Sequence, residues 1–296
     1  MPQKRTSLIA LSLFITLLLS GAQSAASSFK TVDFPGAVET QLYQIDTNAI
    51  DGNLAVGYYL DQLGVAHGFL WTQSGTKTSF DFPGAAATYA YGINAKGNIA
   101  GWYVDSNGVN HGYVYDSGKF ITIDPPNSSS TQAWDINYAN MIVGTYFDSI
   151  TGQYRGFTFF RGVYSPYDVQ GAAHTELHGL SHGGASVGMY IKSNGVEHGF
   201  VLGGKFIELT HPGSTVTSAD RIARDDSGNV VGSYADNDSS PLSGFGIKDA
   251  NSSKKFITVT YPGATNTWVH GLNSARWLVG GYSDSAGNIH GFAYIP

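Results

Sequence analysis

The sequence predicts an all-β fold, a six-bladed β-propeller built of four-stranded blades. Two observations support this prediction. A unit of about 45 residues recurs six times, and its apolar residues come in short runs rich in β-branched and aromatic side chains, with no stretch of helical period. A small four-stranded sheet cannot bury both faces alone, so the copies must pack on one another, either as a closed propeller or as an open β-repeat solenoid.

Each unit carries one tight turn and four predicted strands. The turn holds a Pro-Gly pair or its replacement, at positions 35–36, 83–84, 126–127, 170–171, 212–213 and 262–263. In the second unit we predict strands at 88–94, 98–105, 111–115 and 120–124. Asp105, Ser106, Asn107 and Gly108 join the second strand to the third, and this sequence predicts a hairpin because Asp and Asn bond their own backbone and Gly accepts positive φ.

The two ends of the repeat array favour the closed ring over the solenoid. The first copy begins with a strand of the fourth type, 29–34, and the last copy stops after a strand of the third type, 290–295. The N-terminal strand therefore supplies the strand that the last blade lacks. A solenoid would more often end in atypical polar caps, which this sequence does not contain.

Residues 1–26 have the pattern of a secretory signal peptide. Lys4 and Arg5 precede an apolar run at 8–19 and small residues at 21–26. An uncleaved membrane anchor is the alternative, although the run is shorter than the ~20 residues that span a bilayer. After cleavage we expect no membrane span, one repeat domain at 27–296, and a secreted protein of the periplasm or extracellular space. The six repeats are predicted at 29–77, 78–119, 120–163, 164–205, 206–255 and 256–296.

Composition restricts the partners of this domain. The chain has 16 basic and 22 acidic residues, and removal of Lys4 and Arg5 leaves 14 basic residues and a formal charge of −8. Nucleic acid is therefore a poor partner. The chain has no cysteine, so an exported domain must rely on its core rather than on disulfides. We expect a monomer that binds an extracellular glycan or a surface protein.

The best-preserved stretches of the repeat resemble a known family. The series Pro-Gly-Ala, Gly-Ile-Asn, Gly-Asn-Ile-Ala-Gly and His-Gly-Tyr at 83–113, echoed at 262–292, is similar to the bacterial extracellular repeats of the HAF family. The likeness covers essentially the whole chain after the leader. It implies an exported repeat protein, and it implies no biochemical role for any residue.

Two pairs of repeating columns have structural explanations. Glycine recurs at 57, 101, 144, 188, 232 and 280, and tyrosine follows two residues later in all six copies. We expect this glycine to let a neighbouring blade approach while the tyrosine fills the space beside it. An aspartate ends the second strand in five copies, at 61, 105, 148, 236 and 284, and a histidine opens the third strand in four, at 67, 111, 198 and 290. Pairs in separate blades cannot form one active site, so we expect turn capping and cross-hairpin hydrogen bonds.

A functional site should lie where equivalent positions differ, because structural demands are shared by the copies and chemical ones need not be. Three residues after the repeated threonine of the innermost strand, the copies carry Tyr43, Tyr91, Trp134, His178, Asp220 and His270. In a propeller these residues would surround the central channel, with Asp135 and Arg221 adding charge nearby. We hypothesise that this ring and Arg221 bind a carbohydrate or another polar ligand. The alternative is that these side chains merely wedge between blades.

The leading functional interpretation is a secreted, non-catalytic protein that binds an extracellular glycan or surface partner on one propeller face. The first alternative is a carbohydrate-active lyase or hydrolase at the central channel, and the second is a purely structural cell-surface protein. The sequence has no G-x-S-x-G elbow, P-loop, H-E-x-x-H or C-x-x-C motif, which argues modestly against an enzyme. No catalytic residue, metal site or cofactor is predicted, with a divalent cation at His178, Asp220 and His270 as the alternative.

Overall fold

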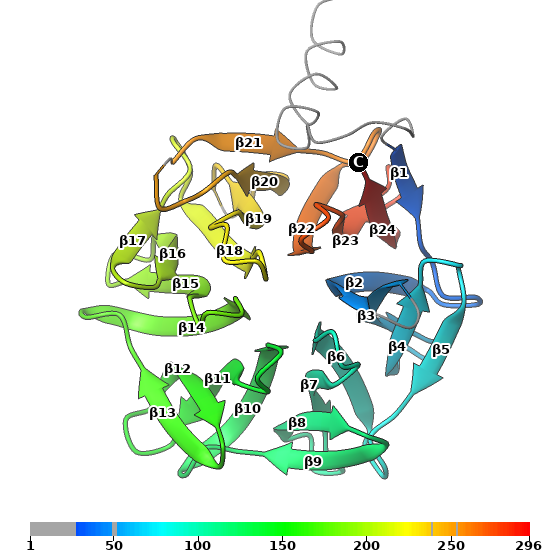
Figure 1. Cartoon of the computed structure of the whole chain (residues 1–296), viewed down its shortest axis with the longest axis horizontal. Helices are drawn as coiled ribbons and strands as arrows, with labels where there is room; N and C mark the ends of the chain where they lie inside the picture. Colours follow the sequence, from blue (N-terminus) through cyan, green and yellow to red (C-terminus); the bar gives the residue numbers. More distant parts are fainter. Residues whose placement is uncertain (1–27, 49–51, 238, 253) are drawn as a thin grey trace, which may run out of the picture.

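The computed structural model describes residues 28–48, 52–237, 239–252 and 254–296. Within these residues the regular elements are 24 β-strands, arranged as four-stranded groups around a central axis (Figure 1). The protein is thus an all-β propeller with four-stranded blades, as the repeats predict. The predicted signal peptide, 1–26, lies outside the described residues. No helix in the described part of the chain is long and apolar enough to cross a membrane.

The first three groups follow one another along the chain. The first contains β2 (Glu39–Asn48), β3 (Gly52–Leu60), β4 (Ala66–Thr72) and β5 (Lys77–Phe80). The second contains β6 (Ala87–Ile93), β7 (Ile99–Val104), β8 (Asn110–Asp116) and β9 (Lys119–Ile123). The third contains β10 (Ser128–Ile136), β11 (Ile142–Asp148), β12 (Gln153–Phe160) and β13 (Val163–Tyr167). The four strands predicted for the second unit are therefore confirmed to within about a residue at each end.

The remaining groups continue this order until the chain ends. The fourth contains β14 (Ala172–Leu180), β15 (Ser186–Lys192), β16 (Glu197–Leu202) and β17 (Phe206–Leu209). The fifth contains β18 (Val216–Ile222), β19 (Val230–Ala235), β20 (Ser243–Ile247) and β21 (Phe256–Val259). The last contains β22 (Asn266–Leu272), β23 (Leu278–Ser283), β24 (Ile289–Ile295) and the N-terminal β1 (Ser28–Thr31).

The repeats predict six separate sheets, but backbone hydrogen bonds join the strands of the described residues into five. Four groups are independent four-stranded sheets, whereas the first and last groups share one eight-stranded sheet. The link between the two groups is a parallel bridge between Glu39, the first residue of β2, and Ile289 of β24. This single residue pair joins two antiparallel four-stranded units at the point where the ring closes.

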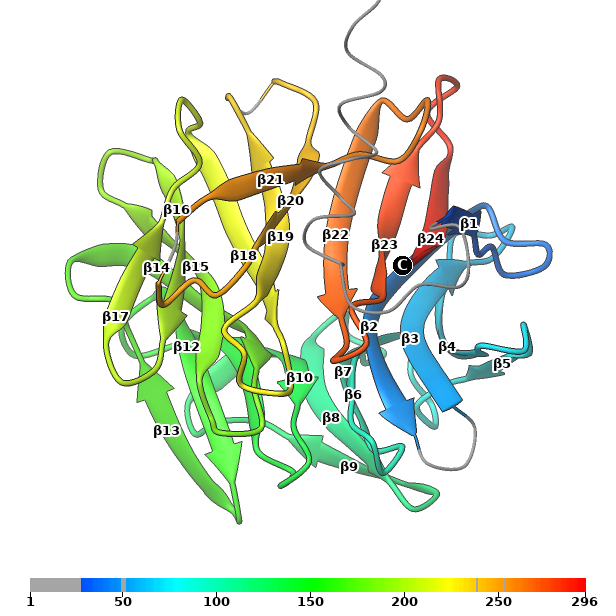
Figure 2. The same cartoon turned by 45° about the horizontal axis from the view of Figure 1, so that its top comes forward.

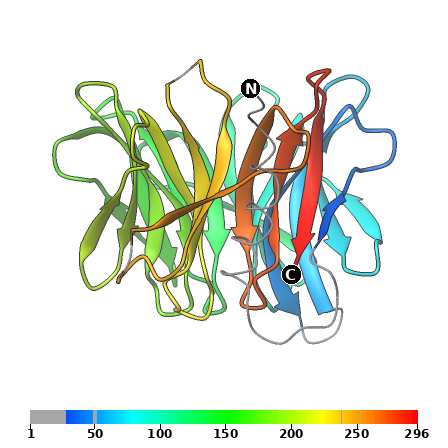
Figure 3. The ribbon, with the colours of Figure 1, turned by 90° about the horizontal axis from the view of Figure 1, so that it is seen from above.

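The N-terminal strand completes the last group, as the offset of the repeats predicted. β1 pairs antiparallel with β24, from Ser28 opposite Ile295 to Thr31 opposite Phe292. The first and last strands of the chain lie side by side in Figure 1 and again in Figure 2, where the molecule is tilted. A ring closed by this pairing excludes the open solenoid. Seen from the side, the ring is a thick disc with loops on both faces (Figure 3).

Every innermost strand contains a β-bulge at the same place. The register of each innermost strand with the next strand skips one residue, and the six skipped residues are Tyr43, Tyr91, Trp134, His178, Asp220 and His270. A bulge leaves the extra residue unpaired and lets two consecutive side chains point to the same side of the strand. The column that the sequence analysis selected is therefore the set of bulge residues.

The repeated glycines make room for the bulge in their own blade. The prediction that they allow a neighbouring blade to approach is therefore wrong. A Cβ on any of the six would lie 1.9 to 2.3 Å from a carbonyl oxygen of the innermost strand in the same blade, two residues before the bulge. The close approach between blades occurs instead at the glycine after the histidine column. There, a Cβ on Gly199 would meet Ala219, and one on Gly244 would meet Val269, both on the next blade.

Candidate functional site

The six bulge residues form one closed ring around the axis, called here the axial ring. The aromatic contacts have ring-centroid distances of 4.1 Å for Tyr43 and Tyr91, 4.5 Å for Tyr91 and Trp134, 5.0 Å for Trp134 and His178, and 4.3 Å for His270 and Tyr43. Asp220 closes the ring, with Oδ1 3.6 Å from His178 Nδ1 and Oδ2 3.3 Å from His270 Nδ1. The structure thus brings together all six residues predicted at the channel.

A second layer of side chains lies next to the axial ring, toward the propeller face that carries the Pro-Gly turns. These residues stand two positions earlier on the innermost strands, and period-two alternation turns them to the same side. They are Gln41, Tyr89, Gln132, Glu176, Ser218 and Trp268. This layer was not predicted, although its residues stand two positions before the ring residues in every copy of the repeat.

One side of the two layers is aromatic. Tyr89 stacks on Trp102 of β7 at 3.8 Å, and its edge meets Tyr58 of β3 at 4.9 Å. Tyr58 donates a hydrogen bond to Glu39, and Gln41 donates to Glu39 as well. With Tyr43, Tyr91 and Trp134 these side chains form a continuous surface of rings with a carboxylate and an amide at its edge. Such a surface suits the apolar face of a sugar whose hydroxyls need polar partners.

The other side is a chain of alternating imidazoles and carboxylates. Glu176 lies between two histidines, with Oε1 2.6 Å from His174 Nε2 and Oε2 2.7 Å from His178 Nε2. His178 continues to Asp220, and Asp220 continues to His270. Ser218 donates a hydrogen bond of 2.7 Å to Asp220 Oδ1. Five ionisable groups from three blades therefore share one network at the axis.

This network separates the pKa values of its members. Burial alone would lower the pKa of His178, but hydrogen bonds with Asp220 and Glu176 outweigh burial and raise the pKa to about 9. Burial alone would raise the pKa of Glu176, but hydrogen bonds from His174 and His178 lower it to about 2. The pKa of Asp220 is lowered by the same balance, with His178 and His270 as partners. At neutral pH the centre of the network is an imidazolium between two carboxylates.

Glu197, at the start of β16, differs from these carboxylates. Burial raises the pKa of Glu197 to about 7, opposed by the charge of His178 and reinforced by the charges of Asp220 and Glu176. Its carboxyl group therefore exchanges its proton near neutral pH, within the electrostatic reach of the network. Sequence reasoning did not identify Glu197, because its raised pKa depends on burial and on the nearby network, which the repeat pattern does not reveal.

Several polar atoms around the axial ring have no hydrogen-bond partner within the protein. They are Nε2 of His270, Nε1 of Trp134 and Nε1 of Trp102, all buried. Buried donors and acceptors are costly when they are unpaired. The ring side chains keep partial access to solvent, with 10% of the His178 side chain and 13% of the Asp220 side chain exposed.

Arg221 lies beyond the axial ring, toward the opposite face. Its side chain is 2% exposed. Its terminal nitrogens donate hydrogen bonds to the main-chain carbonyls of Tyr91, Trp134, His178 and Asp220, at 2.7 to 3.0 Å. Arg221 thus ties together the backbones of four ring residues, and its contribution to the predicted site is to hold the ring in place.

A buried ion pair forms the next layer along the axis. Arg224 donates two hydrogen bonds to the carboxylate of Asp135, at 2.7 and 3.0 Å, and Asp135 is 0% exposed. Arg224 also bonds the carbonyls of Ile93 and Leu180. Asp135 was expected beside the ring, whereas Arg224 was not predicted because it follows β18 in a loop without a repeat signature.

The residues considered for a metal do not form a metal site in the described part of the chain. No group of three His, Cys, Asp or Glu side chains there has an arrangement that could hold an ion. His174 and His178 both contact Glu176, whereas His182 packs against Tyr138, 6.1 Å between ring centroids. His182, which follows β14, therefore does not join His174 and His178.

The Asp-His column lies at the rim and has the capping role that was predicted. Asp105 accepts hydrogen bonds from the backbone N–H groups of Asn107 and Val109 in the hairpin. His111 lies between Asp124, at 2.7 Å, and Asp105, at 3.7 Å. The same arrangement recurs at His67 and His290. These three groups are separate, and each stabilises its own hairpin.

No family model matches the chain, and no curated protein matches it. Solved structures of low sequence identity share its fold. A putative TolB from Agrobacterium tumefaciens superposes with a TM-score of 0.56 at 12% identity, covering 86% of this chain and 90% of its own. A variant of the Aleuria aurantia lectin in complex with alpha-methyl-L-fucoside gives 0.54 at 12%, covering 89% and 93%. A gluconolactonase from Xanthomonas campestris gives 0.52 at 11%, covering 92% and 90%. The likeness concerns the fold, which serves binding proteins and enzymes alike.

Proposed function

We propose that this chain is an exported, six-bladed propeller of the HAF repeat type that binds a glycan at the axial ring. The six-blade count treats the eight-stranded sheet as two blades, because a single residue pair joins its halves and because six inner strands each contribute one bulge residue. Export rests on the signal-like leader of the sequence. The fucoside-bound lectin supports the proposal at the level of the fold.

One observation carries the glycan proposal, namely the asymmetry of the axial ring. Equivalent positions of six similar blades hold aromatic rings on one side and an imidazole-carboxylate network on the other. A pyranose has an apolar face that packs on aromatic rings, and hydroxyls that bond charged and neutral polar groups. The aromatic side of the axial ring would thus bind the apolar face, and the imidazole-carboxylate side would bind the hydroxyls. Purely structural filling of the axis would not require a buried network of five ionisable groups.

The test compares conservative substitutions at the axis with matched substitutions at the rim. The native protein is screened by calorimetry against soluble oligosaccharides of fungal, plant and bacterial walls. His178→Gln and Asp220→Asn remove ionisable groups at the axis, whereas His290→Gln and Asp284→Asn remove a similar pair at the rim. We expect the axial variants to weaken the binding of an identified oligosaccharide at least tenfold, on the order of 1.4 kcal/mol, and the rim variants to leave it unchanged.

Two results would contradict the proposal. Equal weakening by the axial and rim pairs would indicate a general loss of structure rather than a site. A screen in which no oligosaccharide binds, together with unchanged thermal stability at millimolar sugar, would favour the structural cell-surface alternative.

A carbohydrate-active enzyme is the second candidate, and Glu197 is the observation that favours it. A carboxyl group with a pKa of about 7 lies near carboxylates whose pKa values are lowered, and such a separation is typical of acid-base pairs. Release of reducing ends or of unsaturated products from a bound polysaccharide, lost in Glu197→Gln, would establish this function. Binding without any product would leave the non-catalytic proposal.

A further inference from the structure

A covering ring stacks on the repeated tyrosine in four of the six blades. The residue just before each Pro-Gly turn provides it. The stacked pairs have centroid distances of 3.8 Å for Phe34 and Tyr59, 3.7 Å for Phe82 and Tyr103, 3.5 Å for His211 and Tyr234, and 3.7 Å for Tyr261 and Tyr282. The interplanar angles of these pairs do not exceed 12°. The fold therefore contains, in each of these blades, a flat slot with a ring in it.

The outermost strand of the blade supplies the other wall of this slot. Phe82 meets Phe120 edge-on at 5.2 Å, and His211 meets Phe256 at 5.1 Å. In the blade closed by β1, Tyr261 meets Phe29 at 5.3 Å. In these three blades the covering ring is thus held between a tyrosine of the second strand and a phenylalanine of the outermost strand.

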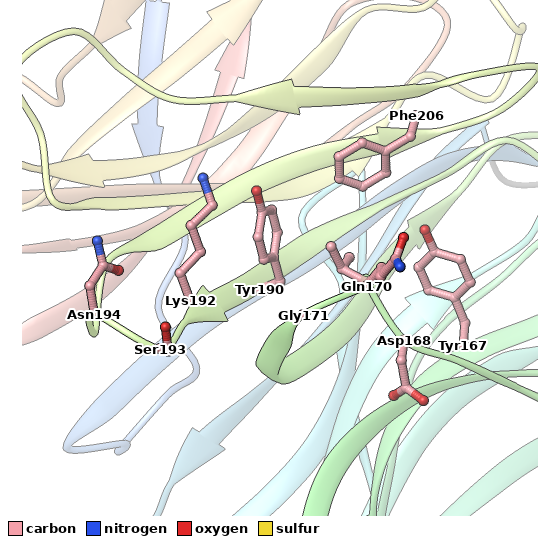
Figure 4. A pocket seen from close by; sticks show the side chains of 10 residues that line it. Tyr167, Asp168, Gln170, Gly171, Tyr190, Lys192, Ser193, Asn194 and Phe206 are labelled. Carbon is pink, nitrogen blue, oxygen red and sulfur yellow. The ribbon is translucent and has the colours of Figure 1, made fainter.

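The blade formed by β14 to β17 has both walls of the slot but lacks the ring. Val169 stands where the other blades have Phe34 or Phe82, and its backbone N–H makes the same hydrogen bond to a threonine, Thr175. A cavity of about 730 Å³ lies there, lined by Val169, Tyr190 and Phe206 among others (Figure 4). Phe206 is 42% exposed, whereas its counterparts Phe120 and Phe256 are partly buried. The missing ring accounts for both the cavity and the exposure.

Three departures of this blade from the repeat pattern all line the cavity. Val169 replaces the covering ring, Gln170 replaces the proline of the turn, and Lys192 replaces the aspartate of the hairpin. Figure 4 shows Lys192 and Tyr190 projecting from β15 to the same side, with Ser193 and Asn194 at the tip of the hairpin. Lys192 Nζ bonds Glu208 at 3.2 Å, and the Tyr190 hydroxyl bonds the same carboxylate, so this wall is ordered.

We propose that this cavity, the open slot, is a second sugar-binding site, which takes one pyranose ring of a glycan in place of the missing aromatic ring. The sugar ring would lie on Val169 and Tyr190 beside Phe206, whose ring meets that of Tyr190 edge-on with centroids 6.1 Å apart. Its hydroxyls would bond the amides and hydroxyl of Gln170, Ser193 and Asn194 and the ammonium of Lys192. The charges of Lys192 and Glu208 offset each other, so a neutral sugar fits better than an acidic one.

A protein side chain such as tryptophan is a less suitable occupant. A stacked indole would leave the polar groups of Gln170, Ser193 and Lys192 beside a ring that has one N–H and no acceptor. A pyranose offers several hydroxyls to these groups. The open slot belongs to the outer part of one blade and does not include any axial-ring residue, so this inference goes beyond the axial site and does not depend on it.

The experiment restores the missing ring. Val169→Phe gives this blade the residue found at Phe34 and Phe82, which should fill the slot and keep the fold. Saturation-transfer NMR of the native protein with the methyl glycosides of glucose, galactose, mannose, fucose and N-acetylglucosamine measures binding. We expect at least one glycoside to bind natively and to bind at least tenfold more weakly to Val169→Phe, with a melting temperature equal to or above that of the native protein.

Matched controls separate this site from others. In the third blade, Pro125 replaces the covering ring over Tyr146 and lines a cavity of about 670 Å³. Pro125→Phe fills this other slot and should therefore leave glycoside binding unchanged. Val169→Ala should also keep binding, and His178→Gln tests the axial site separately. The proposal is overturned if no methyl glycoside binds, if Val169→Phe binds as tightly as the native protein, or if N-acetyltryptophanamide is bound at the slot in preference to every sugar.

Discussion

At the scale of single residues, the repeated threonine of the innermost strand shows how one missing N–H changes the role of a side chain. Thr88 accepts a hydrogen bond from the backbone N–H of Phe82 at 3.0 Å, and four other blades make the same bond. In the third blade the equivalent donor position is Pro125, which has no N–H. Thr131 Oγ1 is accordingly buried without a partner.

This difference predicts opposite outcomes for the same substitution. Thr88→Val should lower the free energy of unfolding by about 1 kcal/mol, because an N–H loses its acceptor. Thr131→Val should leave the free energy unchanged or raise it, because no hydrogen bond is lost and a buried unpaired oxygen is removed. Urea denaturation of both variants measures the difference. An equal loss in the two variants would show that the hydrogen bond contributes nothing.

The raised pKa of Glu197 predicts a pH-dependent effect on stability. The folded state binds this proton more tightly than the unfolded state, so the stabilisation is complete below the ordinary pKa of 4.5 and is lost as pH rises through about 7. Glu197→Gln removes this loss. Relative to the native protein, the variant should gain about 3 kcal/mol between pH 4 and pH 8.

Thermal melts of the two proteins across that range test this prediction. Both keep His178, whose pKa of about 9 causes a further loss of stability at alkaline pH, and that loss cancels in the difference. A difference that does not change with pH would mean that Glu197 titrates normally in the folded protein.

At the scale of the strand, the bulge explains why only one of two adjacent glycines of β23 has room for a side chain. A Cβ on Gly280 would lie 1.9 Å from the carbonyl oxygen of Trp268, whereas a Cβ on Gly281 would come no closer than 3.3 Å, to the side chain of Gln41. At the position of Gly281 the first two blades carry Tyr58 and Trp102, so side chains fit there.

Alanine at these two positions should therefore have unequal effects. Gly280→Ala should cost about 3 kcal/mol or more, because the innermost strand must move to relieve the contact. Gly281→Ala should change the free energy of unfolding by less than about 0.5 kcal/mol. Chemical denaturation checks both. Similar, small effects would indicate that the bulge adapts to a side chain, and the explanation of the glycine column would fail.

The elements were largely predictable and the side-chain network was not. The turns and apolar runs repeat, so the strands, the hairpins and the closing role of the N-terminus follow from the sequence. The axial ring was found because its positions differ between copies. The bulge that turns Asp220 and Arg221 together toward the axis was not predicted, so neither the Glu176 network nor the burial of Arg221 could be derived from period-two alternation.

At the scale of the whole molecule, Arg224 connects four blades. It bonds Asp135 of β10, the carbonyls of Ile93 and Leu180, and lies 3.6 Å from Asp46 of β2. The pKa of Asp46 is raised by burial, which the charge of Arg224 only partly offsets. Breaking one partner of such a buried pair is more harmful than removing both, because a lone buried charge remains.

Asp135→Asn should therefore destabilise the protein by about 3 kcal/mol or more. The double variant Asp135→Asn with Arg224→Met should recover more than half of that loss, because the uncompensated charge is gone. Urea denaturation followed by the fluorescence of the five tryptophans measures the cycle. Additive losses in the double variant would mean that the two residues act independently.

Closure of the ring depends on a strand of four residues, so one side chain can test it. Phe29 of β1 contacts Tyr261, Phe292 and Tyr294, with centroids 4.9 to 5.5 Å away, whereas Lys30 of the same strand is exposed. Phe29→Ala should cost about 3 kcal/mol, and Lys30→Ala under about 1 kcal/mol.

Deletion of residues 28–36 should add aggregation, because β24 becomes an open edge in a chain without disulfides. Light scattering and thermal melts of these three proteins decide the matter. A monomeric deletion variant with native stability would show that the blades remain a ring without β1, and that contacts between neighbouring blades suffice to close it.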